Sequence, residues 1–160
     1  MSNYSDLRDA ILARVQSVAN VGTTHNRLRW SSNVSDYLDT FTSSIGGQVQ
    51  TRAWMVTWEG IPEAWADPSA FGRIGERYVF TVMGIESFKD SAATEGTLYD
   101  LVELVKEALR NRKDFGLANV VDYSVRVTVP TLEVRQFGSV LCHVAELKVE
   151  VDVVQAVTFA

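Results

Sequence analysis

The sequence predicts an α+β domain in which a mixed, mainly antiparallel β-sheet carries helices on one face and ends in a long C-terminal strand. Three observations predict this class. Helical periodicity occurs in the first third of the chain and again in the middle, whereas the last third alternates apolar and polar side chains. No linker or repeat divides the chain, so residues 1–160 are expected to form one domain.

Two helices are expected before the first strand. Residues 4–18 place Leu7, Ile11 and Val15 on one stripe, which is typical of a helix that packs on a core. Residues 34–42 predict a second, weaker helix with a shorter apolar side. A double glycine soon after it predicts a break in the chain.

The middle of the chain predicts two strands joined by a long loop. Residues 48–58 and 76–86 are rich in β-branched and aromatic types, which favour strands. Trp54 and Trp58 share one face of the first strand, and we expect both to pack in the core. Between the strands, residues 59–75 hold two prolines and three glycines. A loop of that length predicts contact with another surface.

The clearest local signal is a helix at residues 95–113. An unbroken apolar stripe comprises Leu98, Leu101, Val102, Val105, Ala108 and Leu109. Asp100 lies early and Arg110 lies late, which complements the helix dipole. Gly116 is expected to follow the end of this helix.

The C-terminal third predicts strands. Residues 123–129 alternate apolar and polar types, Pro130 indicates a turn or a sheet edge, and residues 131–137 form a short strand. Residues 140–154 then predict a strand of roughly 50 Å, at about 3.3 Å per residue. Its apolar positions change from even to odd near Ala145, which predicts a β-bulge or a change of partner. A strand this long is expected to project and to meet a partner.

Composition narrows the function classes. The chain is 46% hydrophobic and 22% charged, which excludes disordered, collagenous and coiled-coil proteins. Its net charge of −5 argues against general nucleic-acid binding, because that affinity depends on Lys and Arg, but such a protein can let DNA pass without adhering to it. No apolar run approaches the ~18 residues of a membrane helix. The first residues lack the pattern of a signal peptide, so we expect the chain to stay where it is made.

No catalytic, metal or cofactor site is expected, and the chain is predicted not to be an enzyme. Neither a phosphate-binding loop nor a nucleophile elbow is present, and the single cysteine allows no internal disulfide. His25 is interpreted as an exposed loop residue. Cys142 is interpreted as a small core residue, because it and His143 point to opposite faces of a strand and cannot form a catalytic pair.

Charged and aromatic side chains predict contact surfaces instead. Glu146, Lys148, Glu150 and Asp152 share one strand face, which is more typical of a solvated or interface-facing row than of a metal site. Trp65 lies in the expected loop, as does Trp30 in another. A tryptophan in a loop is either an anchor for a second protein or a cover for its own core.

Three stretches together resemble the tail-terminator and neck (tail-completion) proteins of tailed bacteriophages. The first is the strand, short connector and helix of residues 78–109, and the second is the strand VLCHVAELKVEVDVV at 140–154. The third is an N-terminal helix that ends in Val-Ala-Asn-Val-Gly and is followed by Arg27 and Arg29. This pattern covers most of the chain and contains no catalytic signature.

The resemblance implies a virion component of the tail or neck, assembled in the host cytoplasm as a closed homo-oligomeric ring, usually a hexamer. Such a ring caps the tail tube, ends its polymerisation and joins the tail to head–tail connector proteins, with DNA passing through its lumen without specific binding. It uses no cofactor and contacts no membrane. The candidate interface with other subunits or the tube comprises Arg27, Arg29, Trp65, Arg73, Glu146, Lys148 and Glu150. Two alternatives stay open: another phage neck or head-completion subunit, and a small cytoplasmic ligand-binding α+β domain.

Overall fold

The computed structural model of the chain describes residues 4–29, 34–66, 73–88, 93–110, 114–122, 124–137 and 140–156. Within these ranges the helices are α1 (Tyr4–Gln16), α2 (Val34–Thr40) and α3 (Thr94–Arg110). The strands are β1 (Thr23–His25), β2 (Thr42–Ile45), β3 (Gln48–Ala66), β4 (Arg73–Ser87), β5 (Arg126–Phe137) and β6 (Val140–Ala156). The predicted α+β class is confirmed.

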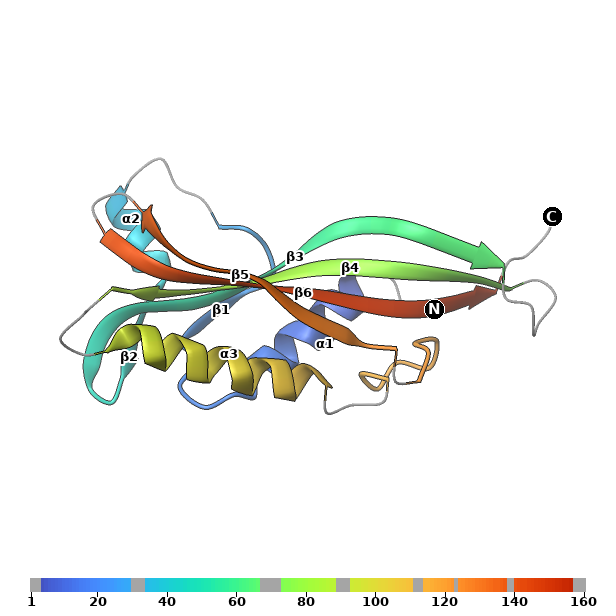
Figure 1. Cartoon of the computed structure of the whole chain (residues 1–160), viewed down its shortest axis with the longest axis horizontal. Helices are drawn as coiled ribbons and strands as arrows, with labels where there is room; N and C mark the ends of the chain where they lie inside the picture. The colour runs from blue at the N-terminus through green and yellow to red at the C-terminus, as the bar shows by residue number, and fades with distance from the viewer. Residues whose placement is uncertain are drawn as a thin grey trace.

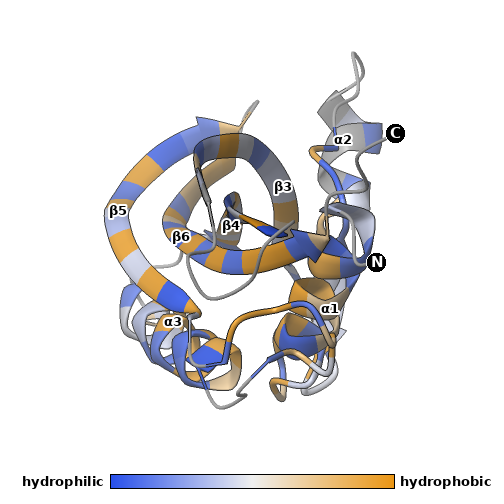
Figure 2. Ribbon diagram, turned by 90° about the vertical axis from the view of Figure 1, so that its right-hand side faces the viewer, coloured by the Kyte–Doolittle hydropathy of each residue, from blue (hydrophilic) through white to orange (hydrophobic). Residues whose placement is uncertain are grey.

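The strands form one mixed sheet in the order β1-β3-β4-β6-β5, with β2 also paired to β3. Every pairing is antiparallel except that of β1 with β3. Figure 1 shows α1 and α3 together on one face of the sheet, which we call the helix face, and β3, β4 and β6 running on past both helices. Seen along the strands, the sheet curves away from these helices (Figure 2). The outer parts of these three strands therefore extend beyond the helical layer. We call the outer part of β3, together with the parts of β4 and β6 paired beside it, the arm.

The arm contains most of the segment that was expected to be a loop. The prediction of a loop at 59–75 is wrong, because β3 continues to Ala66 and β4 begins at Arg73, while residues 67–72 lie outside the described part. Register shifts on either side of Gly60, where φ is 131°, take up the glycine and proline that suggested a loop. Because edge strands tolerate proline at such bulges, the glycine and proline content of this segment does not require a loop.

The main core lies between the helix face and helices α1 and α3. Trp54 is fully buried there, as predicted, and its ring lies over Gly84, where an added Cβ would come within 2.8 Å of the indole. The stripe predicted for α3 is also buried, with Leu98, Val105 and Leu109 at its centre, except for Ala108, which is partly exposed. The cover is incomplete toward the outer half of β3, although Val151 and Val153 of β6 are still fully buried. The prediction for Trp58 is therefore wrong, since 44% of it is exposed.

β6 is buried on both faces at its beginning and on one face at its end. The bulge or change of partner predicted in β6 near Ala145 is wrong, because β4 and β6 pair without a register shift. The irregularity in the pairing of β5 with β6, opposite Leu147, is an extra residue in β5. The even positions are apolar first because a second, small core on the opposite face includes Val144 with Phe41, Met55 and Ile85. The two cores overlap along the strand, and this overlap produces the change of phase.

Other expectations are corrected in detail. β5 continues through Pro130, with a register shift between Thr128 and Thr131, so this proline marks an edge and no turn. His25 is no exposed loop residue: it lies half-buried in β1, where its Nε2 is 3.1 Å from the carbonyl oxygen of Thr40. In the described part of the chain, no helix is long and apolar enough to cross a membrane.

Candidate functional site

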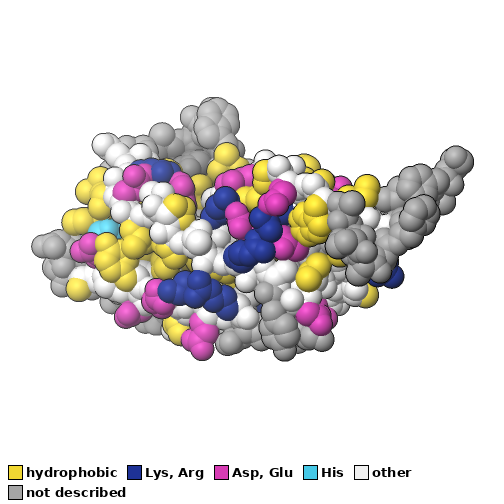
Figure 3. All heavy atoms as spheres, turned by 45° about the vertical axis from the view of Figure 1, so that its right-hand side comes forward, with side chains coloured by type: hydrophobic (Ala, Val, Ile, Leu, Met, Phe, Trp, Pro, Cys, Tyr) yellow, Lys and Arg dark blue, Asp and Glu magenta, His cyan; other side chains and the backbone are white. Residues whose placement is uncertain are grey.

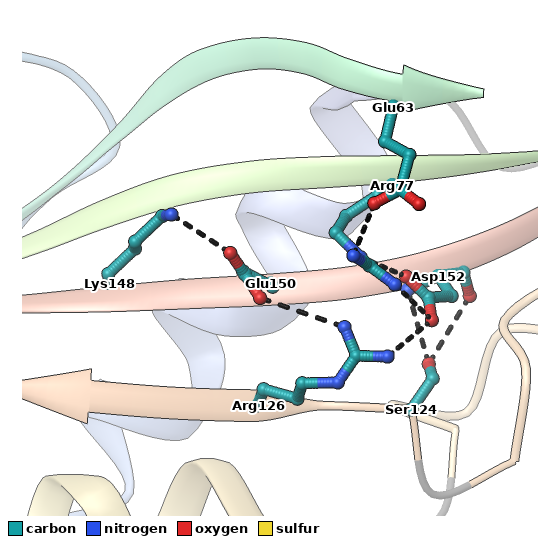
Figure 4. A network of polar contacts seen from close by, with 7 residues as sticks. All are labelled: Glu63, Arg77, Ser124, Arg126, Lys148, Glu150 and Asp152. Carbon is teal, nitrogen blue, oxygen red and sulfur yellow. Dashed lines mark hydrogen bonds and ion pairs between the residues drawn. The ribbon is translucent and has the colours of Figure 1, made fainter.

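A cluster of alternating charges lies on the sheet face opposite the helices. We call it the charged strip, and it comprises Glu63, Arg77, Arg126, Lys148, Glu150 and Asp152 (Figure 4). Its members come from β3, β4, β5 and β6, which the register brings side by side. Three of them are successive even positions of β6, so one face of a single strand supplies half of the strip.

Asp152 is the centre of the charged strip, and only 7% of it is exposed. Its Oδ1 accepts a hydrogen bond from Arg77 Nε at 2.8 Å, and its Oδ2 accepts one from Arg126 Nη2 at 2.9 Å. The backbone of Asp152 is held as well, because its N–H donates to the Ser124 hydroxyl at 3.2 Å. The hydrogen bond to Asp152 is the main reason that the pKa of Arg77 is raised. Arg77 also pairs with Glu63, so four strands are tied together through one guanidinium and one carboxylate.

The other end of the charged strip is more exposed. Lys148 Nζ lies 2.9 Å from Glu150 Oε1, and this hydrogen bond is the main reason that the pKa of Glu150 is lowered. Arg126 Nη1 lies 3.6 Å from the other carboxylate oxygen of Glu150. Further along β6, Glu146 pairs with Arg135 at 2.9 Å. The view in Figure 3 accordingly shows basic and acidic side chains mixed together instead of separated into fields of one sign.

The backbone of β6 is paired on both sides. β4 covers one side, and β5 covers the other as far as Glu150. Past Glu150 the segment before β5 takes over, with hydrogen bonds of 2.9 Å from Val121 N–H to the Asp152 carbonyl and from Val154 N–H to that of Asn119. Among the described residues, β6 is therefore an interior strand of the sheet, with a paired neighbour on each side, and it is not an edge strand.

The open edges of the sheet belong to β5 and to the outer half of β3. Among the described residues, β5 has β6 as its only strand partner, and β3 beyond Met55 has only β4. Large apolar side chains are exposed beside both edges: Leu132 and Val134 on β5, and Trp58 and Ile61 on β3. Open edges with exposed apolar side chains are a template for pairing with another chain.

The structure brings together only part of the predicted interface. Glu146, Lys148 and Glu150 lie along one face of β6, as the alternation indicated. Trp65 is connected to the same region, because its ring lies directly on Gly75 and 5.8 Å from the guanidinium carbon of Arg77.

Three other predicted residues lie apart from the charged strip. Arg73 is exposed at the start of β4. Arg27 and Arg29 follow β1, where the burial of His25 lowers the pKa of its ring and the two guanidinium groups add to this effect. Trp30 is outside the described residues.

Sequence reasoning missed Arg77 and Arg126, which complete the charged strip. Arg77 directly follows Glu76, and Arg126 precedes a mostly apolar and neutral stretch; neither belongs to a motif. A signal was present: each occupies a strand position on the face opposite the core, as do the acidic residues of β6. Using it required the register between strands, which one sequence does not supply.

The remaining reactive groups form no catalytic cluster in the described residues. Burial raises the pKa of the Cys142 thiol to about 11, so it is protonated near neutral pH. His143 lies on the other face of β6 and packs against Phe88, with ring centres 4.7 Å apart. Within the described ranges no three His, Cys, Asp or Glu side chains are grouped so that they could hold a metal ion.

Comparisons with known proteins do not assign the chain to a family. No protein-family model matches the chain, and no curated protein matches it.

Proposed function

We propose that this protein is a structural subunit of a tailed bacteriophage, which assembles into a closed ring, caps the tail tube and joins the tail to the head connector. The single observation that carries the proposal is that the sheet ends in two unlike open edges, β5 and outer β3, on either side of a fully paired central strand. The resemblance to tail-terminator and neck proteins supplies the place of the ring and its expected number of six subunits.

Two unlike edges favour a ring over a twofold dimer. A surface that complements itself gives a dimer and then is used up, whereas a contact between two different surfaces leaves one of each free on every dimer. When each added copy is related to the previous one by the same rotation, a ring closes if a whole number of these rotations makes a full turn. Edge strands supply such a contact through main-chain hydrogen bonds, as in other cases of strand addition.

The charge distribution supports a ring through which DNA passes freely. The chain carries a net charge of −5, and the three bases of the charged strip are each paired with a carboxylate. Paired bases release few counterions from a phosphate backbone and so contribute little affinity for DNA. A lumen lined in this way would hold no DNA segment in place.

The proposal is tested by the mass and the capping activity of the purified chain. Size-exclusion chromatography with light scattering should give a discrete oligomer, and negative-stain electron microscopy should show rings. Added to polymerising tail-tube protein of the same phage, the ring should stop tube growth at one ring per tube end. A chain that stays monomeric, alone and with tube protein, contradicts the proposal. Rings that leave tube growth unchanged overturn the capping role and favour another neck or head-completion subunit.

A further inference from the structure

We propose that the protein binds the phosphate group of a small molecule in a cavity between the N-terminus of α3 and His143 of β6. This inference goes beyond the proposed ring and does not depend on it. The cavity has a volume of about 210 Å³. Figure 1 shows the start of α3 and the start of β6 at the same end of the sheet, away from the arm. The residues that line the cavity are Phe88, Ala93, Thr94, Glu95, Gly96 and His143.

The first turn of α3 supplies two N–H donors to this cavity. α3 has 17 residues, and Thr97 N–H donates to the carbonyl of Ala93 at 3.4 Å. The N–H groups of Glu95 and Gly96 come before this bond, so the helix offers them no acceptor. The aligned peptide dipoles also leave a partial positive charge at this end. Gly96 is exposed, and a Cβ added to it would meet no atom within 4 Å, so its backbone is open to a ligand.

His143 reaches the same cavity from the sheet and is the observation that points to a ligand. Only 5% of it is exposed, and within the described residues neither ring nitrogen has a hydrogen-bond partner. A buried polar group without a partner is costly, and an imidazole that lines a cavity recovers this cost by donating to a ligand. Packing against Phe88, with ring centres 4.7 Å apart, holds the imidazole in place.

Two acidic side chains lie near the cavity, and each has a partner of its own. Glu86 stands beside His143 in the sheet, and its Oε1 lies 2.5 Å from Arg52 Nη2. Burial raises the pKa of Glu86, which further reduces its negative charge. Glu95 is exposed to water, and its Oε1 accepts a hydrogen bond of 2.6 Å from the hydroxyl of Tyr99. Neither carboxylate, so held, takes up the donors of the cavity.

The number and placement of the donors favour a phosphate group. Two N–H groups come from the helix and one comes from the imidazole, so the donors approach from two sides. A phosphate group offers three outer oxygens for them, whereas a carboxylate offers two oxygens in one plane. Helix N-termini bind phosphate through the same combination of free N–H groups and dipole. At about 210 Å³ the cavity is smaller than the pockets of about 300–1,000 Å³ that enclose drug-sized ligands, so the ligand is small.

The surface beside the cavity indicates where the rest of a phosphate ester would lie. Phe88 is 39% exposed, and its N–H donates to the carbonyl of Leu141 at 2.8 Å. Leu141 is 44% exposed and stands on the same face of β6 as His143. An apolar group attached to the phosphate would remove part of this surface from water. An aromatic phosphate ester is therefore expected to bind more tightly than inorganic phosphate.

Equilibrium dialysis of the whole chain against radiolabelled inorganic phosphate, at constant ionic strength, tests the site. We expect one phosphate per chain, with a dissociation constant on the order of 1 mM. Transverse-relaxation-optimised NMR spectra should show saturating shifts at the backbone N–H groups of Glu95 and Gly96 and at the ring of His143. The same titration with phenyl phosphate identifies the source of the group. Tighter binding of the ester assigns the site to a phosphate ester, and tighter binding of inorganic phosphate assigns it to the free ion.

Three variants separate the site from the general effect of charge. His143→Leu removes the imidazole donor and should weaken binding by about tenfold. Because His143 is buried in the sheet, Gly96→Asp tests the cavity from the helix instead. An acid in the first turn stabilises a helix and meets no atom here, so this chain should fold and exclude phosphate. Leu104→Asp, at a position of the same helix that is 49% exposed, adds the same charge and should leave the affinity unchanged.

The outcomes distinguish this site from the proposed ring. Equal losses from Gly96→Asp and Leu104→Asp would show that phosphate responds only to total charge, which overturns the site. Shifts confined to other residues, or no retained phosphate, overturn it as well. Light scattering measures assembly separately, so rings that bind no phosphate leave the proposed function standing. A chain that stays monomeric but binds phosphate through Gly96 and His143 overturns the ring and leaves the phosphate site standing.

Discussion

The two faces of β6 carry different kinds of side chain and stabilise the protein in different ways. Its odd positions, from Ala145 to Val153, are apolar and fully buried in the main core. Its even positions begin in a small apolar core at Val144 and then become the charges of the strip. On the first face burial fixes the strand, and on the second ion pairs between strands hold its neighbours in place.

The difference between the two faces indicates which part of the sheet supplies the free energy of folding and which part is left open for assembly. Removing apolar area from water contributes about 25 cal/mol per Å², so the helix face supplies most of the folding free energy. Ion pairs near a surface contribute little, about 0–1 kcal/mol each, but they require one geometry. In the outer half of β3 the apolar cover is incomplete, as the exposure of Trp58 and Ile61 shows, and this edge is left open for contact with a partner.

The largest expected effect separates two tryptophans on the same face of β3. Trp54→Ala empties a site that is fully buried under the helices and should lower the free energy of unfolding by about 3–5 kcal/mol. Trp58→Ala, four residues on and 44% exposed, is the matched control and should cost about 1 kcal/mol or less in the isolated subunit. Urea unfolding followed by circular dichroism measures both. Similar losses for the two variants would contradict the boundary between the covered half and the arm.

A smaller effect is expected in the charged strip. Asp152→Asn keeps the shape of the side chain but removes the charge that two guanidinium groups share, and we expect a loss of about 1–3 kcal/mol. Arg135→Gln, in the more exposed pair with Glu146, should cost about 1 kcal/mol or less. Both are measured by urea unfolding in low and in high salt. The loss at Asp152 should persist in high salt, because this carboxylate is buried; equal losses for both variants would mean that the strip has no buried centre.

The sequence predicted the covered half of the molecule better than the arm. Helical periodicity located α1 and α3, and β-branched and aromatic residues located the central strands, because burial under helices imposes a strong apolar pattern. The arm lacks that cover on one face. Its glycine and proline were interpreted as a loop at 59–75, although in an edge strand they form bulges.

The candidate site could be predicted only within one strand. The even positions of β6 were identified from alternation, and three of the predicted residues lie together as expected. Their partners Arg77 and Arg126 come from strands far away in the sequence, and only the register of the sheet brings them near. The open edges depend on strand order, which alternation does not determine, so β6 was expected to reach a neighbour although it lies in the middle.

One acidic side chain on the helix face, that of Glu86, is more deeply buried than any charged side chain of the charged strip. Glu86 is fully buried where β4 leaves the main core, and its Oε1 lies 2.5 Å from Arg52 Nη2. Its Oε2 has no hydrogen-bond partner among the described residues. Burial raises the pKa of this carboxyl above its ordinary value of 4.5, and Arg52 offsets only part of the increase.

A pKa raised by folding makes stability fall with rising pH. Between 4.5 and the raised pKa the folded chain still holds a proton that the unfolded chain has released, so each step upward in pH favours unfolding. Glu86→Gln removes this titration and keeps the shape. Urea unfolding of both chains from pH 4 to pH 8 should show the wild-type protein losing stability relative to the variant as the pH rises, since all other groups cancel in the difference. Parallel profiles would mean that Arg52 compensates the burial in full, and a relative gain with pH would mean that the pair behaves like the exposed ion pairs of the strip.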